Sequence, residues 1–143
     1  MIRLITGAKG TGKTKIIIDM ANDNVETAKG DIVFLTDTDR YMYSLRYQVR
    51  VINVCNFLKK GDAPISEESL IGFIKGILAG NHDIETLYID GAHRMLKKPV
   101  SEMEDFFTDI YAIGKDTETK FVLTVSEDEE KFPEFLNKYH KEG

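Results

Sequence analysis

Gly7-Ala8-Lys9-Gly10-Thr11-Gly12-Lys13-Thr14 is the stretch that decides the fold, and it reads G-x-x-x-x-G-K-[ST]. A short apolar run, residues 2–6, precedes it, and the residues that follow it can continue as a helix. A strand, a glycine loop and a helix in this order are the context in which the pattern binds phosphate. We therefore expect a nucleotide-phosphate site near the start of the sequence.

Each residue type in this stretch has a physical role. Backbone N–H groups must come close to phosphate oxygens, and Gly7, Gly10 and Gly12 leave room for that approach. The helix that begins near Lys13 adds N–H groups and the positive end of its dipole. Lys13 would reach the β- and γ-phosphates, and the Thr14 hydroxyl would hold Mg²⁺. The predicted nucleotide-binding residues are Gly7, Ala8, Lys9, Gly10, Thr11, Gly12, Lys13 and Thr14.

A second motif lies two-thirds along the chain. Residues 86–90 read Thr-Leu-Tyr-Ile-Asp, an apolar strand that ends in Asp90. This is the Walker B pattern, in which the acidic group at the strand tip completes the magnesium site. We predict that Thr14 and Asp90 are the metal-binding residues. The alternative is that Asp90 is a turn aspartate followed by a glycine.

These two motifs resemble those of the P-loop NTPases, in particular the small RecA-like (ASCE-type) ATP-binding proteins. The resemblance implies a three-layer α/β/α sandwich on a mostly parallel sheet, the P-loop NTPase fold, with ATP and Mg²⁺ as ligands. A weaker resemblance to the small thymidine kinases rests on the Asp-Thr-Asp-Arg-Tyr segment at 37–41. The glutamate that follows the Walker B aspartate in those kinases is replaced by Gly91, and Cys55 is the only cysteine, which leaves no cysteine zinc site.

The alternation of apolar segments agrees with an α/β fold. Further strands are predicted at 31–36, 48–54 and 120–125, and a helix is expected to begin at Ser66. A capping box at 101–104 predicts the start of another helix, which we expect to end at Gly114. A short helix after Pro133 would close the chain.

Composition bounds the class of protein. The chain has 143 residues, with 42% hydrophobic and 30% charged residues, which suits a single domain over 1–143. It contains neither a signal peptide nor a run of about 20 apolar residues, so we expect a cytoplasmic protein without a membrane partner. The net charge of −5 argues mildly against nucleic acid as a partner.

The segment 40–50 reads R-Y-M-Y-S-L-R-Y-Q-V-R and has two interpretations. Its arginines and tyrosines could form a surface that stacks on bases and holds phosphates. Alternatively, its tyrosines pack against the core while its arginines face water. We favour the second interpretation.

Hydrolysis requires a group that orients the attacking water, and Gly91 stands where the RecA-like branch often has a glutamate. Glu127 could substitute for it if the strand at 120–125 lies beside the Walker B strand. His93 could sense the γ-phosphate or polarise water, or it could be a neutral histidine that is hydrogen-bonded at the start of a loop. The candidate catalytic residues are therefore Lys13, Glu127 and His93.

Three functions remain open, and we favour the first. The chain could be a Mg²⁺-dependent ATP-binding protein that hydrolyses ATP slowly, or when a partner protein or a second copy activates it. It could be a small-molecule (nucleoside-type) kinase, with Arg40, Arg46 or Arg94 holding the transferred phosphoryl group. It could also be a regulatory module that binds nucleotide without turnover. The absence of an N-K-x-D-type segment favours ATP over GTP.

Overall fold

One six-stranded parallel sheet organises the chain, in the order β3-β2-β4-β5-β1-β6. The structure is a computed structural model that describes residues 1–142. The strands are β1 (Ile2–Gly7), β2 (Asp31–Thr36), β3 (Val49–Asn53), β4 (Ile84–Ile89), β5 (Lys120–Ser126) and β6 (His140–Glu142). The α-helices are α1 (Lys13–Asn24), α2 (Cys55–Leu58), α3 (Glu67–Gly80), α4 (Ala92–Leu96) and α5 (Glu104–Thr117). Short 3₁₀ turns lie at η1 (Met42–Ser44), η2 (Val100–Glu102), η3 (Glu129–Lys131) and η4 (Glu134–Lys138).

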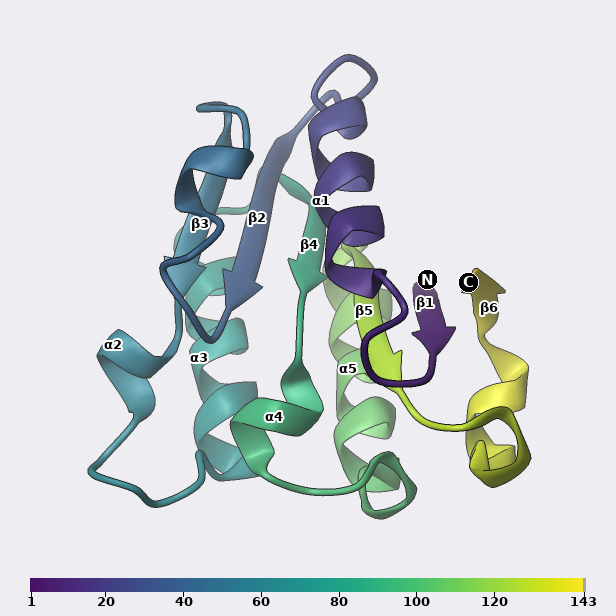
Figure 1. Cartoon of the computed structure of the whole chain (residues 1–143). Helices are drawn as coiled ribbons and strands as arrows, with labels where there is room; N and C mark the ends of the chain where they lie inside the picture. The colour runs from purple at the N-terminus through teal and green to yellow at the C-terminus, as the bar shows by residue number, and fades with distance from the viewer. Residues whose placement is uncertain (143) are drawn as a thin grey trace.

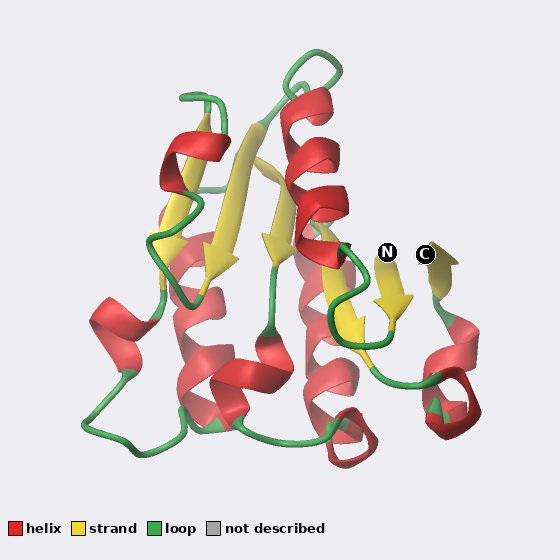
Figure 2. Ribbon diagram, in the orientation of Figure 1, coloured by secondary structure: helices red, strands yellow, loops and turns green. Residues whose placement is uncertain are grey.

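The helices cover the sheet unequally. α3 and α5 lie on one face, and α1 lies on the other (Figures 1 and 2). Two buried apolar clusters fill the spaces between the layers, and the larger of them lies beneath α3 and α5. The expected three-layer α/β/α sandwich is confirmed, and the sheet is parallel throughout.

Local sequence explains the best-defined elements. The apolar run in β2, residues 32–35, is buried, as expected for a strand covered on both faces. The Ser66 Oγ accepts a hydrogen bond from the Ser69 N–H at 3.0 Å, which caps α3 as its sequence predicts. In the described part of the chain, no helix is long and apolar enough to cross a bilayer.

The predicted limits of α5 were wrong at both ends. No side chain caps the helix, which begins after Met103, so there is no capping box at 101–104. The helix continues through Gly114 to Thr117 and ends at Glu118, which has a left-handed φ of 58°. Gly114 serves packing instead, because a Cβ there would lie 3.0 Å from the Thr119 carbonyl oxygen and 3.2 Å from the Phe121 ring.

The end of the described chain also differs from the prediction. The closing segment contains two 3₁₀ turns, η3 and η4, and then β6, which pairs with β1. β1 therefore lies inside the sheet, between β5 and β6. Because all six strands are parallel, their carboxyl ends meet at one edge, where the glycine loop and α4 also lie (Figure 1).

Candidate nucleotide-binding site

The glycine loop, residues 7–12, connects β1 to α1 at this edge. Gly7, Gly10 and Gly12 have φ values of 152°, 81° and 86°, which side chains would disfavour. Gly12 occupies the N-cap position of α1, where no side chain accepts a hydrogen bond, and the first turn carries no acidic residue. The N–H groups at this end of α1 therefore have no capping side chain, as an anion site requires.

The Lys13 side chain crosses the loop. Its Nζ donates to the Ala8 carbonyl oxygen at 2.6 Å and to the Thr11 Oγ1 at 3.4 Å, and the Thr11 hydroxyl also donates to the Ala8 carbonyl. Burial lowers the pKa of Lys13, while the nearby Asp90 carboxylate opposes that shift. The ammonium is thus held over the loop by a carbonyl oxygen and a hydroxyl of the loop itself.

Thr14 and Asp90, 76 residues apart in sequence, meet beside the loop. The Thr14 Oγ1 donates to the Asp90 Oδ2 at 3.1 Å. The Thr124 Oγ1 donates to the Asp90 Oδ1 at 2.9 Å and accepts from the Gly91 N–H at 2.9 Å. These bonds hold a fully buried carboxylate with one oxygen facing Thr14.

Magnesium fits this arrangement. A hydroxyl and a carboxylate oxygen converge, and Mg²⁺ is usually held by one or two carboxylates together with phosphate oxygens and water. The Thr36 Oγ1, at the end of the neighbouring strand β2, is buried without a hydrogen-bond partner among the described residues. A metal-bound water would satisfy such a hydroxyl. Within residues 1–142, no group of three or more His, Cys, Asp or Glu side chains could hold a metal without the nucleotide.

Arg94 lies across the mouth of the site. Its Nε and Nη2 reach the two carboxylate oxygens of Asp37 at 3.1 and 3.3 Å. Nη2 also lies 3.4 Å from the Asp90 carbonyl oxygen and 3.6 Å from its Oδ2. The guanidinium lies over Gly91, whose φ is 89°, and a Cβ there would collide with Nη2 and Cζ. Gly91 is therefore required by its backbone angle and by the position of Arg94.

Glu127 and His93 line one pocket of about 410 Å³, together with Lys9, Arg94, Ser126 and Asp128. β5 lies beside β4, which is the arrangement that the Glu127 hypothesis requires. The Glu127 N–H donates to the Gly7 carbonyl oxygen at 3.1 Å, while its Oε1 accepts from the Asp128 N–H at 2.9 Å. Glu127 is therefore tied to the glycine loop by its backbone, and its carboxylate is bonded locally.

His93 is neutral at pH 7. Burial, with the nearby charges of Arg94 and Lys13, lowers its pKa to about 4. Its Nδ1 is buried and has no hydrogen-bond partner in the described part of the chain. The lowered pKa agrees with the interpretation of His93 as a neutral histidine, but Nδ1 makes no hydrogen bond among the described residues, which that interpretation includes.

Two further pockets lie at this edge of the sheet. One of about 770 Å³ lies on the β6 side and is lined by Thr6, Gly7, Ala8, Glu127, Asp128, Phe132, Asn137 and Lys141. The other, of about 260 Å³, lies beyond Thr14 and is lined by Thr14, Asp37, Thr38, Arg40, Tyr41 and Arg94. Arg40 and Arg94 thus lie at the phosphate end of the site. Arg46 does not, since its Nη1 pairs with the Glu26 Oε1 at 2.6 Å.

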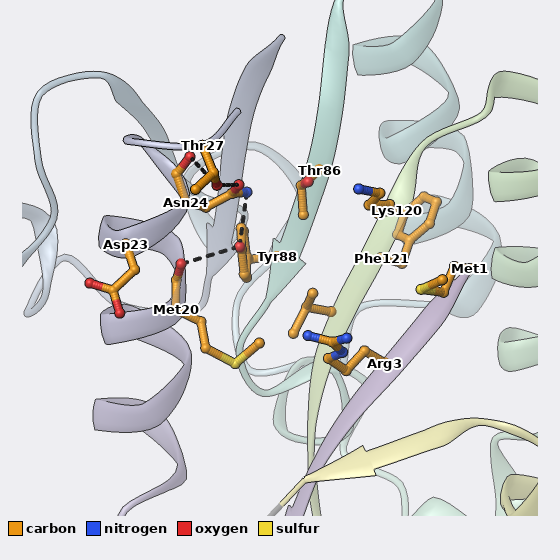
Figure 3. A pocket seen from close by; sticks show the side chains of 11 residues that line it. Met1, Arg3, Met20, Asp23, Asn24, Thr27, Thr86, Tyr88, Lys120 and Phe121 are labelled. Carbon is orange, nitrogen blue, oxygen red and sulfur yellow. Dashed lines mark hydrogen bonds between the residues drawn. The ribbon is translucent and has the colours of Figure 1, made fainter. Parts of the chain in front are cut away.

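A pocket of about 450 Å³ is separate from these, at the amino ends of the strands beside α1 (Figure 3). There the Tyr88 hydroxyl donates to the Met20 carbonyl oxygen at 3.4 Å and accepts from the Asn24 amide at 3.1 Å. Burial raises the pKa of Tyr88. None of the residues lining this pocket belongs to the glycine loop.

Sequence reasoning missed two members of the site, Thr36 and Thr124, and the role of a third, Asp37. Thr36 and Thr124 flank Asp90 in the register of the sheet, and Asp37 holds Arg94. The signal available for Thr36 and Thr124 was a hydroxyl residue within an otherwise apolar strand. Asp37 belongs to the 37–41 segment that the sequence singled out, but its pairing with Arg94 joins positions 57 residues apart and could not be predicted.

Comparison with known proteins supports the fold. No protein-family model matches the chain, and no curated protein matches it. Among solved structures, the KaiC-like protein PH0186 from the hyperthermophilic archaeon Pyrococcus horikoshii OT3 is similar, with a TM-score of 0.64 and 14% sequence identity. The match covers 88% of this chain and 62% of that one, so this chain spans less than two thirds of its neighbour. At this level of identity the similarity shows a shared α/β fold.

Proposed function

We propose that the chain binds a nucleoside triphosphate with Mg²⁺, ATP in preference to GTP, and is a slow or partner-activated ATPase. The observation that carries this proposal is the convergence of Lys13, Thr14 and Asp90 beside the glycine loop, with the Thr14 hydroxyl 3.1 Å from the Asp90 carboxylate. Residues 1–143 would form a single nucleotide-binding domain, since both apolar clusters pack against one sheet.

The side chains of the loop would bind the phosphates. Lys13 would exchange its bond to the Ala8 carbonyl for one to the β- and γ-phosphates, a charge-assisted bond that is stronger than the one it replaces. Thr14 and Asp90 would hold Mg²⁺, directly or through water. The bound ion would neutralise charge on the phosphate oxygens. Phe132 and Asn137, in the 770 Å³ pocket on the other side of the loop, would face the nucleoside.

We expect slow turnover because the Asp37 and Glu127 carboxylates, which could orient the attacking water, already accept hydrogen bonds. Gly91 has no side chain to do so, and Asp37 at the end of β2 is engaged by Arg94. Glu127 and His93 remain near the loop, but the Glu127 carboxylate accepts a bond from its neighbouring N–H. An activating protein, or a second copy of this chain, would release one of these carboxylates or supply another.

A second candidate function is phosphoryl transfer to a small acceptor. The 260 Å³ pocket beyond Thr14 favours it, because two guanidinium groups and the Asp37 carboxylate line a space beside the expected γ-phosphate. Nucleotide binding without turnover is the third candidate. It is supported by the hydrogen bonds that already engage the carboxylates of Asp37 and Glu127.

Calorimetric titration with Mg·ATP and Mg·GTP tests the proposal. Lys13→Ala should abolish binding. Lys15→Ala is the matched control, since Lys15 is exposed and pairs with Asp19 on the surface of α1, and it should bind as the wild type does. Phosphate release with and without candidate partners would then separate ATPase from binding module, and acceptor-dependent ADP formation would identify a kinase. If neither nucleotide binds, or if Lys13→Ala binds normally, the proposal is wrong.

A further inference from the structure

Two tyrosines between β2 and β3 are almost completely exposed. Tyr43 exposes 97% of its surface and Tyr47 exposes 93%, while Phe57 in α2 exposes 67%. Of the three tyrosines in residues 40–50, Tyr41 packs against the core, where it is partly buried beside the smaller apolar cluster. The interpretation in which these tyrosines pack is therefore wrong for Tyr43 and Tyr47, and large aromatic surfaces face solvent.

The same part of the chain is strongly basic. Residues 40–60 hold five of the 19 basic residues and none of the 24 acidic ones, so this segment carries +5 and the remainder −10. Arg46 pairs with Glu26. The other four, which are exposed, are Arg40, Arg50, Lys59 and Lys60. Basic residues thus share this segment of the chain with the most exposed aromatic rings of the described residues.

This segment, which we call the basic edge (residues 40–60), forms one side of the molecule. It comprises η1, the edge strand β3 and α2, which follow one another along that side of the sheet (Figure 1). Its first residue, Arg40, lines the pocket next to Thr14. The basic edge therefore extends away from the candidate phosphate site.

We infer that the basic edge binds single-stranded nucleic acid. Unpaired bases stack on exposed aromatic rings, and a positive groove or edge attracts the phosphate backbone. Both features are present here within 21 consecutive residues. The net charge of −5 opposes such binding only weakly, since screening limits the reach of distant charges to about 10 Å at 0.1 M salt. This inference does not depend on nucleotide binding at the glycine loop.

Fluorescence anisotropy with a labelled oligodeoxythymidine of about 20 nucleotides, at low salt and without nucleotide, tests the inference. Tyr43→Ala and Tyr47→Ala should each weaken binding roughly 5- to 150-fold, the range expected from the loss of one stacked base. Phenylalanine at either position should retain binding, because the ring remains. Tyr111→Ala is the control, since Tyr111 is a half-exposed tyrosine on α5, and it should leave the affinity unchanged.

Salt and strand type give independent readouts. Arg50→Ala should reduce the slope of log affinity against log salt by about 0.7, the contribution of one phosphate contact on a single strand. A matching oligouridine should also bind, whereas a duplex should bind more weakly because its bases are not free to stack. Lys13→Ala should bind the oligonucleotide normally, which separates this result from the proposed nucleotide function.

Three results would overturn the inference: no binding of the oligonucleotide, equal affinity of the tyrosine-to-alanine variants and the wild type, or duplex binding as tight as that of the single strand. A concentration-dependent dimer that Tyr43→Ala disrupts, in the absence of oligonucleotide binding, would instead assign the basic edge to a contact between copies. Because the tyrosines are exposed, folding of the variants should be unaffected, and circular dichroism would check this.

Discussion

Gly91 stands where the RecA-like proteins that the sequence motifs resemble often have a glutamate. Replacing it is therefore an obvious experiment, and the structure predicts the outcome. A Cβ at position 91 would lie 2.8 Å from the Arg94 Nε and collide with the rest of the guanidinium. Even Gly91→Ala must therefore displace the guanidinium of Arg94, and we expect this to break its two bonds to Asp37. We predict that this single methyl group destabilises the protein.

The expected loss has two parts. An alanine in the left-handed conformation, at the φ of 89° found here, costs about 1–2 kcal/mol. The Arg94–Asp37 pair is partly open to solvent, with side-chain exposures of 42% and 21%. Its loss therefore adds only about 0.5–1 kcal/mol. Gly91→Ala should thus lower the free energy of unfolding by about 1.5–3 kcal/mol.

Urea denaturation of four proteins measures these parts separately. They are the wild type, Gly91→Ala, Arg94→Ala and the double variant. Once Arg94 is truncated, the alanine at 91 retains only its backbone strain, so the double-mutant cycle should give a coupling of about 0.5–1 kcal/mol. Gly91→Glu should likewise be destabilised and should not raise phosphate release above the wild-type rate. The reasoning would be refuted by additive effects in the cycle, or by a stable Gly91→Glu variant with increased turnover.

Other parts of the structure give three shorter predictions. Thr124→Val removes both bonds that Thr124 makes, to Asp90 and to the Gly91 N–H, and should lower the free energy of unfolding by about 2–4 kcal/mol in urea and weaken Mg·ATP binding. The pKa of His93 falls from 6.5 in the unfolded chain to about 4 on folding, so between these pH values only the unfolded chain binds the proton. The free energy of unfolding should therefore be highest above pH 6.5 and should decrease as the pH falls towards 4. After allowance for partial exposure, this decrease should be about 2 kcal/mol. Urea unfolding at several pH values would measure it, and His93→Asn should show a smaller dependence on pH. Equal dependence in the two proteins would contradict the prediction. Ser66→Ala, which removes the cap of α3, should cost about 1 kcal/mol by thermal or urea unfolding, and an unchanged value would contradict the assigned cap.

The sequence was sufficient for the fold because its signals are local. The glycine loop between an apolar run and a helix, and the buried run in β2, each depend on residues close together in the chain. The limits of α5 depend on distant residues instead, since Gly114 is retained for its contact with the Phe121 ring. β6 has the sequence His-Lys-Glu, without an apolar pattern, and forms because β1 offers it a strand to pair with.

The candidate site was predictable to a similar extent. Two motifs, each typical of phosphate or magnesium binding, predicted Lys13, Thr14 and Asp90 as site residues. The structure brings these three residues together. The Arg94–Asp37 pair could not be found in this way, because it requires the order of β2 and β4 in the sheet and the conformation of a long side chain. The exposure of Tyr43 and Tyr47 was likewise undetermined, since alternating tyrosines and arginines suit either a packed or an open segment.

The two helices α1 and α3 begin differently. α3 is completed by its own chain, with Ser66 as its cap and Glu67 and Glu68 in its first turn, whereas α1 begins at Gly12 with neither. In the proposed complex, a phosphate group would cap α1 in the way that a side chain caps α3. Inorganic phosphate or sulfate in a buffer should therefore raise the melting temperature of the free protein, and this increase would measure the occupancy of the loop. If that increase is observed, the buffer anion must be specified whenever the ligand-free protein is described.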